Sequence, residues 1–584
     1  MKNLPHVDAV IIGGGWTGLL MASQLGSRTH LSVAVLERGG ARKLADYLGG
    51  MDELEYNVRF RMMQDYSQET VTLRYTTKDR AVPIRQLGNF LPGTGTGGAG
   101  EHWGATCPRY QADLFELYTK TVERYGAKKL PEDHAIVDWG VTWKDIEPYY
   151  AKGDKLMGVC GKAGNLQGKL IDGGNPFEGP RSEEYPLPPM KLPYAAALFE
   201  QASKSLGYHP YPNPAAALSQ AYTNPDGISR PGCAYCGFCD RFGCMIGAKA
   251  QPTNTLLPIV EKQKSVSLRN NCAVRRIVFD KGAKRARGVQ YIDANGEECF
   301  QPADVVIMGS WTLNNTRLLL LSGVGEQYDP ATGKGAVGRN LTHQVSAGTQ
   351  VFVDKPLNRF MGAAPTGICV SDFDGDAFDH SNLPFIRGGT FRVAGTGFQP
   401  VVSFGVVPPN VKARWGSEWK KASIEWYDKV VGIGFSGEHI AYKTHYFDLD
   451  PRYKDHFGDP LLRMTMDWRP NELEMVKFAT AKAAEIARVM GAKAVIPPPS
   501  YERYDARRYQ STHVQGGTIM GKSPETSVVN PWGQSWELPN LFIMGGSTFA
   551  QNGSANPTTS VIAFTYRTAD ALIDRYLKSP APLA

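Results

Sequence analysis

Three closely spaced glycines near the start of the chain, Gly13, Gly15 and Gly18, constrain its fold more than any other feature. An apolar run precedes them, and a helical periodicity and a second apolar run follow, which predicts a βαβ unit with parallel strands. The glycines would let the backbone turn tightly and approach a pyrophosphate at the helix N-terminus. Glu37, nineteen residues after Gly18, would accept hydrogen bonds from a ribose. The segment therefore predicts a dinucleotide-binding domain.

The length and composition of the chain limit the remaining choices. At 584 residues it exceeds one compact core and should contain two connected domains. Its 42% hydrophobic and 21% charged residues are typical of a soluble globular protein, and a net charge of +7 weakly favours an acidic substrate or partner. No basic arm suggests nucleic-acid binding, and no apolar stretch approaches the ~18–20 residues needed to span a bilayer. No signal peptide is recognisable, which by itself favours the cytoplasm.

The hydrophobic pattern changes in the second half of the chain. Alternation of apolar and polar residues at 345–353, 399–407 and 461–468 predicts an antiparallel sheet, and 471–491 is the clearest predicted helix. A buried-strand pattern returns near residue 540. We therefore expect an α/β, Rossmann-like dinucleotide-binding domain together with an α+β domain built on an antiparallel sheet.

Four of the nine cysteines, Cys233, Cys236, Cys239 and Cys244, lie within twelve residues. The spacing C-x2-C-x2-C-x4-C brings four soft thiolates into one loop, which suits an iron–sulfur cluster. Zinc more often takes two cysteine pairs from separated knuckles, so a zinc site or free thiols are the less favoured readings, and two small disulfides are the alternative in an exported protein. No Cys-x-x-Cys-His motif occurs, so we expect no c-type haem on this chain.

Segments spread along nearly the whole chain resemble the glucose–methanol–choline (GMC) oxidoreductase family. The supporting segments are 13–18, 93–104, 322–325, 337–341, 513–517 and 540–557. The resemblance is weakest at 110–225 and 345–500. It implies FAD as the cofactor and the oxidation of a CH–OH group. It also implies an FAD-binding domain of residues 1–110, 226–344 and 505–584, and a substrate-binding domain of 111–225 and 345–504.

The same resemblance assigns the catalytic and cofactor residues. His513 and Asn556, forty-three positions apart, match the family's base and its hydrogen-bonding partner. A neutral imidazole suits removal of the hydroxyl proton as hydride leaves the carbon, whereas the alternative is a structural histidine beside a Gly-Gly turn. The residues expected around FAD are Gly13, Gly15, Gly18, Glu37, Gly97, Gly98, His102, Trp103, Val274, Gly545, Gly546 and Pro557.

The loop Glu101-His102-Trp103-Gly104 resembles that of pyranose oxidases, in which the histidine is joined covalently to the flavin. The resemblance implies an 8α-histidyl link at His102, with mere proximity to FAD as the alternative. A packed histidine with satisfied nitrogens is the common reading of such a residue.

The cysteine segment 230–249 resembles the cluster loop of multi-subunit sugar dehydrogenases within the family. It implies a three-iron cluster held by Cys233, Cys244 and either Cys236 or Cys239, with a four-iron cluster as the alternative. The substrates expected are sugar acids or polyols, with D-gluconate or 2-keto-D-gluconate first. Arg387 and Arg392 are speculative anchors for a carboxylate, against an exposed structural role for each.

The resemblance also implies an electron route away from this chain. Electrons would pass to a multi-haem cytochrome c subunit and then to quinone, with a small signal-bearing subunit carrying the complex to the periplasmic face of the inner membrane. The cytoplasm is the alternative location. The rival functions are a pyranose-type oxidase that uses oxygen, a fructose, glucose or polyol dehydrogenase of the same family, and a non-catalytic flavin-binding scaffold.

Overall fold

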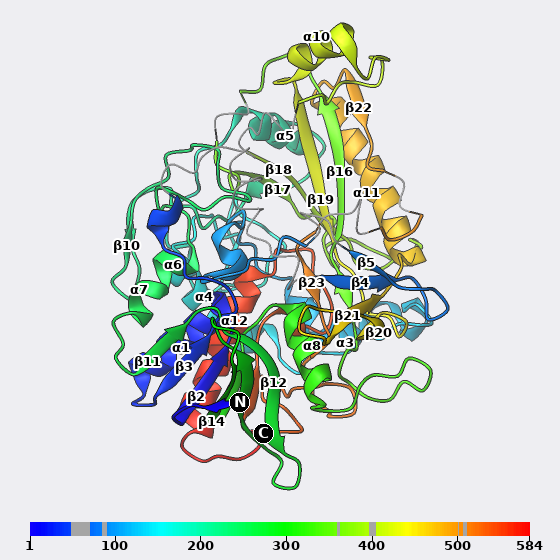
Figure 1. Cartoon of the computed structure of the whole chain (residues 1–584). Helices are drawn as coiled ribbons and strands as arrows, with labels where there is room; N and C mark the ends of the chain where they lie inside the picture. Colours follow the sequence, from blue (N-terminus) through cyan, green and yellow to red (C-terminus); the bar gives the residue numbers. More distant parts are fainter. Residues whose placement is uncertain are drawn as a thin grey trace.

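The structure is a computed structural model, and it describes residues 1–47, 70–84, 90–358, 362–395, 404–499, 502–505 and 511–583. A largely parallel sheet occupies the lower part of Figure 1, and a separate antiparallel sheet rises above it. Both ends of the chain lie at the foot of the molecule, within the lower part.

The parallel strands form the centre of the lower sheet. They lie in the order β11 (Val266–Arg269), β3 (Val33–Leu36), β2 (Val7–Ile12), β14 (Glu298–Met308) and β24 (Leu541–Ile543). Strands β2, β3 and β24 are short, apolar and mostly buried, as expected where helices cover a parallel sheet. The last strand comes from the C-terminal segment, so the two ends of the chain share one sheet.

The long strand β14 also begins an antiparallel extension of this sheet. Its N-terminal half pairs with β13 (Arg285–Ile292), which pairs with β12 (Ala273–Asp280), and β1 (Lys2–Asn3) joins β14 in parallel. Helices α1 (Trp16–Arg28) and α12 (Thr558–Ala571) pack against each other beside the sheet. Apolar side chains of both helices, including Leu19 and Ile562, belong to the same buried core. This packing brings the first and last helices of the chain together.

The upper sheet is antiparallel throughout. Its order is β22 (Ala494–Ile496), β16 (Val345–Phe352), β19 (Val430–Gly437), β18 (Gly389–Ala394), β17 (Gly367–Val370) and β8 (Pro210–Pro212). Helices α5 (Tyr194–Ser205) and α11 (Pro470–Val489) pack against it and share its apolar core. Inward residues alternate with outward ones along β16, β18 and β19.

Further elements lie outside the two large sheets. They are a four-stranded sheet of β20 (Tyr446–Lys454), β21 (Pro460–Thr465), β4 (Val71–Arg74) and β5 (Val82–Ile84), the pair β15 (Thr342–His343) and β23 (Val514–Gln515), and helices α3 (Leu117–Tyr125), α4 (Trp143–Met157), α8 (Thr312–Ser322) and α10 (Gly416–Trp426). Helix α10 projects at the top of Figure 1.

The predicted fold class is confirmed, with a parallel dinucleotide-binding sheet and a second, antiparallel one. The helix predicted at 471–491 is α11, and the strands predicted at 345–353 and 461–468 are β16 and β21. The strand predicted at 399–407 lies largely outside the described residues, and the described residues 404–407 carry no strand. The domain boundaries stay a prediction.

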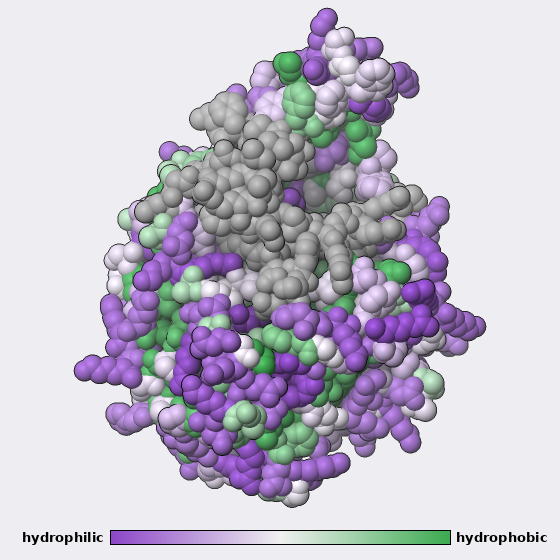
Figure 2. Space-filling view, in the orientation of Figure 1, coloured by the Kyte–Doolittle hydropathy of each residue, from purple (hydrophilic) through white to green (hydrophobic). Residues whose placement is uncertain are grey.

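On the face shown in Figure 2, the described surface of the lower part is mainly hydrophilic, with hydrophobic residues scattered over it. The most exposed large apolar side chains, Trp415 and Ile424, lie at α10. Within the described part of the chain, no helix is long and apolar enough to cross a membrane.

Candidate active site

The first glycine turn follows β2 and leads directly into α1. Gly13 has a φ of +99°, and a Cβ added there would lie 2.9 Å from the Gly309 carbonyl oxygen. A Cβ at Gly18 would collide with the Gly13 carbonyl oxygen, so α1 packs against the turn without space for a side chain. At Gly15, by contrast, the nearest atom to an added Cβ is the Gly97 carbonyl oxygen, 3.9 Å away. Gly15 therefore faces open space, whereas Gly13 and Gly18 are close-packed.

That open space is a cavity of about 280 Å³ between the two ends of the chain. Its lining includes eight of the residues that the sequence assigns to the cofactor: Gly13, Gly15, Glu37, Gly97, Gly98, Val274, Gly545 and Gly546. Sequence reasoning missed other lining residues, among them Arg275, Trp311, Asn314, Arg317 and Phe457. The glycine cradle at the N-terminus of α1, closed by the C-terminal glycines, fits a dinucleotide such as FAD.

The buried carboxylate of Glu37 joins the two glycine loops of this cavity. Its Oε2 accepts a hydrogen bond from the backbone N–H of Gly14 at 2.8 Å. Its Oε1 accepts from Gly39 at 2.8 Å and from Gly95 at 3.2 Å. A direct backbone bond from Gly97 to the Gly14 carbonyl, 2.8 Å long, supports the same contact. The carboxylate thus lies in the cavity wall where a ribose hydroxyl would approach.

His102 and Trp103 pack behind this wall, and neither lines the cavity. The buried His102 ring forms a hydrogen bond of 2.9 Å between Nε2 and the Leu91 carbonyl, and burial lowers its pKa to about 3. Its Nδ1 has no hydrogen-bond partner among the described residues. Trp103 donates to the Ala250 carbonyl at 2.7 Å and packs edge-to-face on Trp16. The covalent link at His102 stays a prediction.

Two further predicted cofactor residues also lie outside the lining. Gly18 has the packing role described above, and Pro557 stands at the N-terminal boundary of α12, directly after Asn556. Pro557 therefore marks the start of α12, the helix that begins directly after Asn556 and packs in the lower core.

The structure brings His513 and Asn556 together. Nδ2 of Asn556 lies 3.2 Å from Nε2 of His513. Burial, aided by the charges of His343 and Arg392, lowers the pKa of His513 to about 3. The imidazole is therefore neutral at pH 7 and can accept a proton.

Gln344, which sequence reasoning missed, decides which nitrogen of His513 accepts that proton. The Oε1 of Gln344 lies 2.5 Å from Nδ1 of His513. The amide nitrogen of Gln344 donates to the carbonyls of Gly553 and Ser554 at 2.9 and 2.7 Å, which assigns the orientation of the amide. Nδ1 must then carry the hydrogen, and the lone pair of Nε2 points to Asn556. No local sequence signal marks Gln344, because its partners lie about 170 to 210 residues further along the chain.

A second, smaller cavity of about 40 Å³ opens beside Asn556. Its lining is rich in polar and charged side chains, which include Lys162, Tyr211, Asn213, Asp374, Thr390, Arg392 and Ser554. Such a lining suits a hydroxylated, charged molecule better than an apolar alcohol.

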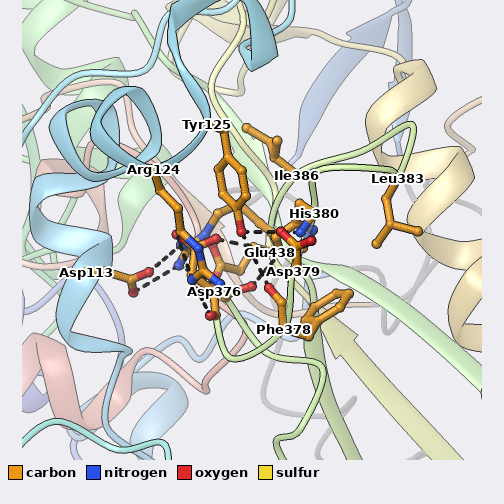
Figure 3. Close-up of polar contacts among 12 residues, drawn as sticks. Asp113, Arg124, Tyr125, Asp376, Phe378, Asp379, His380, Leu383, Ile386 and Glu438 are labelled. Carbon is orange, nitrogen blue, oxygen red and sulfur yellow. Dashed lines mark hydrogen bonds and ion pairs between the residues drawn. The ribbon is translucent and has the colours of Figure 1, made fainter.

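The two arginines singled out in the sequence have different surroundings. Arg387 is fully buried and forms a double hydrogen bond with Glu438, at 2.7 and 2.9 Å. It also bonds Asp113 at 2.6 and 3.2 Å, and Figure 3 shows Asp113, Asp376 and Glu438 gathered around these contacts. Arg387 is therefore a buried structural residue, and both the expected anchor and the exposed role are wrong for it. Arg392 instead lines the cavity beside Asn556.

The four clustered cysteines carry free thiols, two of them buried (Cys239 and Cys244) and two half-buried (Cys233 and Cys236). The disulfide alternative is therefore wrong in this structure. Burial raises the pKa of Cys233 to about 11 and of Cys239 to about 12. Over the described ranges, no three cysteine, histidine or acidic side chains converge as a metal-ligand set. As placed, the thiols do not fit an iron–sulfur cluster.

The cysteine loop nevertheless lies directly against the His102 loop. The buried ammonium of Lys249 donates to the carbonyls of Glu101 and Trp103 at 3.0 and 2.9 Å. It also donates to the carbonyls of Cys239 and Phe242 at 2.9 and 2.7 Å. The two loops are thus held together through one buried cation.

Comparison with known proteins identifies the class to which this fold and site belong. Two GMC oxidoreductase family models match residues 215–346 and 446–565. The chain belongs to the GMC oxidoreductase family, and it is an FAD-dependent oxidoreductase that acts on CH–OH groups.

Individual relatives cover almost the whole chain. It is 41% identical to a gluconate 2-dehydrogenase flavoprotein from Pantoea cypripedii over 100% of this chain and 96% of the relative. It is 25% identical to the fructose dehydrogenase large subunit of Gluconobacter japonicus over 97% and 98% of the two chains. Among solved structures, pyridoxine 4-oxidase from Mesorbium loti has a TM-score of 0.58 at 15% identity, covering 96% and 98% of the two chains. The solved structure shares the fold, whereas the first relative is similar throughout.

Proposed function

We propose that the protein is a dehydrogenase that oxidises a hydroxyl group of a sugar acid or polyol, with D-gluconate or 2-keto-D-gluconate as the leading substrates. The observation that carries the proposal is the neutral His513, with its Nε2 lone pair at Asn556 and beside a polar cavity. The similarity to the gluconate 2-dehydrogenase flavoprotein supports the choice of substrate.

The residues at the site can divide the reaction between them. A substrate hydroxyl that enters beside Asn556 can donate its hydrogen to Nε2 of His513, while its oxygen accepts from the Asn556 amide. Gln344 holds the imidazole in the tautomer that this requires. Gly15, Glu37, Gly97 and Gly545 line the cavity that would hold FAD, which when bound would supply the hydride acceptor. Removal of one hydride and one proton turns the alcohol into a ketone.

The experiment that tests this function is a substrate panel with an artificial electron acceptor, run with and without oxygen. We expect acceptor reduction with sugar acids and no hydrogen peroxide. Peroxide formed at a comparable rate would favour the rival oxidase. Failure to oxidise any sugar acid or polyol would reject the proposal.

We further propose that electrons leave the enzyme near the cysteine loop. The support is its contact with the His102 loop through Lys249 and its four free thiols. The residue types and spacing suit an iron–sulfur cluster, but the thiols do not converge as placed, so no step is derived through such a cluster. The test is to measure iron and acid-labile sulfide in protein purified anaerobically. The absence of both would reject an electron exit through an iron–sulfur cluster at the cysteine loop.

The partners and the location complete the proposal. A relative named as a large subunit supports a multi-subunit enzyme. We propose a multi-haem cytochrome c subunit as the electron acceptor and a small signal-bearing subunit, at the periplasmic face of the inner membrane. Co-expression with each candidate subunit, followed by fractionation of the cell, tests this arrangement, and activity confined to the cytoplasm would contradict it.

A further inference from the structure

Arg392 lines the cavity beside Asn556 and forms no ion pair with any residue that the structure describes. It lies in strand β18, and its Nη1 donates to the Thr106 hydroxyl at 2.9 Å. In the part of the chain that the structure describes, no carboxylate lies at ion-pair distance from Arg392, although a guanidinium offers five N–H donors. Its half-buried position makes an unpaired charge costly, and an anionic ligand would offset that cost.

The other cations that line this cavity already have partners. Arg109 forms ion pairs with Glu147 at 2.9 Å and with Asp154 at 2.7 Å. Lys162 is more exposed and lies 4.0 Å from Glu184. Arg392 is thus the cation of this lining for which no anionic partner is found among the described residues.

Asp374, which lines the same cavity, is suited to contact the hydroxyl groups of a polyhydroxy acid. Oδ2 of the buried Asp374 accepts from Gln111 at 3.0 Å and from Thr390 at 3.1 Å. Its buried Oδ1 has no hydrogen-bond partner among the described residues. An unpaired carboxyl oxygen of this kind can accept a hydrogen from a substrate hydroxyl. The cavity therefore distinguishes the two ends of such a molecule.

We propose that Arg392 binds the carboxylate of a 2-hydroxy acid and thereby presents the adjacent C2 hydroxyl to His513 and Asn556. The proposal rests on the proposed function of this site. Of the two leading substrates it selects D-gluconate, because 2-keto-D-gluconate has no C2 hydroxyl, and it adds Arg392 as the residue that selects acids. C2 loses its hydride to the flavin and its hydroxyl proton to His513, so a 2-keto acid forms and the carboxylate is unchanged. Arg392 and Asn556 line the same cavity. Arg392 is also close enough to His513 for its charge to help lower the pKa of that imidazole.

The test compares D-gluconate with D-gluconamide, which lacks the charge, in wild type and Arg392→Met. We expect the wild-type preference for gluconate in kcat/KM to fall by about tenfold to a hundredfold, the effect of a charge-assisted hydrogen-bond pair. The KM for gluconate should rise more than kcat falls, and Arg392→Lys should recover part of the loss. Lys477→Met is the control: this exposed lysine of α11, paired with Glu474, lies outside the cavity lining, and its loss should leave the preference within about twofold.

A binding measurement separates this proposal from the proposed function. 2-Deoxy-D-gluconate lacks the C2 hydroxyl, so its dissociation constant can be measured by calorimetry on the FAD-loaded protein without turnover at C2. We expect Arg392→Met to weaken its binding at least tenfold at unchanged FAD content. Three outcomes would overturn the role of Arg392: an unchanged preference for gluconate, unchanged binding of 2-deoxy-D-gluconate, or an equal loss in Lys477→Met. Oxidation of neutral polyols alone would overturn the anchor and leave the proposed function standing, whereas binding without any oxidation would reject that function and keep the anchor.

Discussion

Nδ1 of His513 lies 2.5 Å from Oε1 of Gln344, and this contact sets the tautomer of the proposed base. Because the Gln344 amide nitrogen is engaged by the carbonyls of Gly553 and Ser554, its oxygen must face the ring. The carbonyls belong to the segment that carries Asn556, so Gln344 aligns both members of the catalytic pair at once. Gln344 acts through His513 and is a positioning residue.

Replacement of Gln344 by glutamate should change the pH dependence of flavin reduction. A carboxylate beside Nδ1 favours the imidazolium and should raise the pKa of His513 by about 1–3 units above its value of about 3. Since only the neutral ring accepts a proton, the acidic loss of rate should move to higher pH. Anaerobic stopped-flow measurements between pH 4 and 8 check this. Gln344→Met should lower the rate without moving the profile upward, and identical profiles in all three proteins would refute the positioning role.

Replacement of His513 by alanine should remove the base while leaving the cofactor site intact. His513 is not part of the FAD cavity lining, so the protein should retain FAD. The rate of flavin reduction should fall by about 10²–10⁴, the range for loss of a general base. Stopped-flow reduction and the flavin-to-protein absorbance ratio provide the two readouts. A near-normal rate would exclude His513 from the mechanism.

Two glycines of one motif should respond differently to substitution. A side chain at Gly15 enters the open cavity, so Gly15→Val should fold but lose FAD. A side chain at Gly18 collides with the Gly13 carbonyl, so even Gly18→Ala should lower the unfolding temperature of the FAD-free protein. Thermal unfolding with and without added FAD separates the two effects. If Gly15→Val retained FAD like the wild type, the proposal that Gly15 lines the FAD site would be contradicted.

Much of the site could be predicted from the sequence, because short motifs place its main parts. The glycine motif is local, and its strand–turn–helix context is visible within thirty residues. The contact between His513 and Asn556 was predicted from a family resemblance, and the 3.2 Å distance agrees with it. Backbone patterns therefore predicted the lower sheet, and the family resemblance predicted that His513 and Asn556 lie together, whereas their catalytic role stays a prediction.

Other parts depend on contacts that no local pattern contains. Arg387 and Arg392 lie five residues apart, yet only Arg387 meets Asp113 and Glu438, which come from distant segments. The spacing of four cysteines predicts a metal site, but it does not determine the directions of their thiols. Gln344 has no motif at all. Long-range packing therefore decides which of several similar side chains is free to act.

The two arginines provide the sharpest stability prediction. Arg387→Met would leave Glu438 and Asp113 without the cation that they surround, and uncompensated buried charge is strongly destabilising. We expect the free energy of unfolding to fall by about 3–5 kcal/mol. Arg392→Met removes a cation with no carboxylate partner among the described residues, so its effect should stay within about 1 kcal/mol. Urea unfolding of the FAD-loaded proteins measures the free energy of unfolding of both variants. An equal decrease in the two would show that Arg392 also stabilises the fold, which would contradict its assignment to ligand binding.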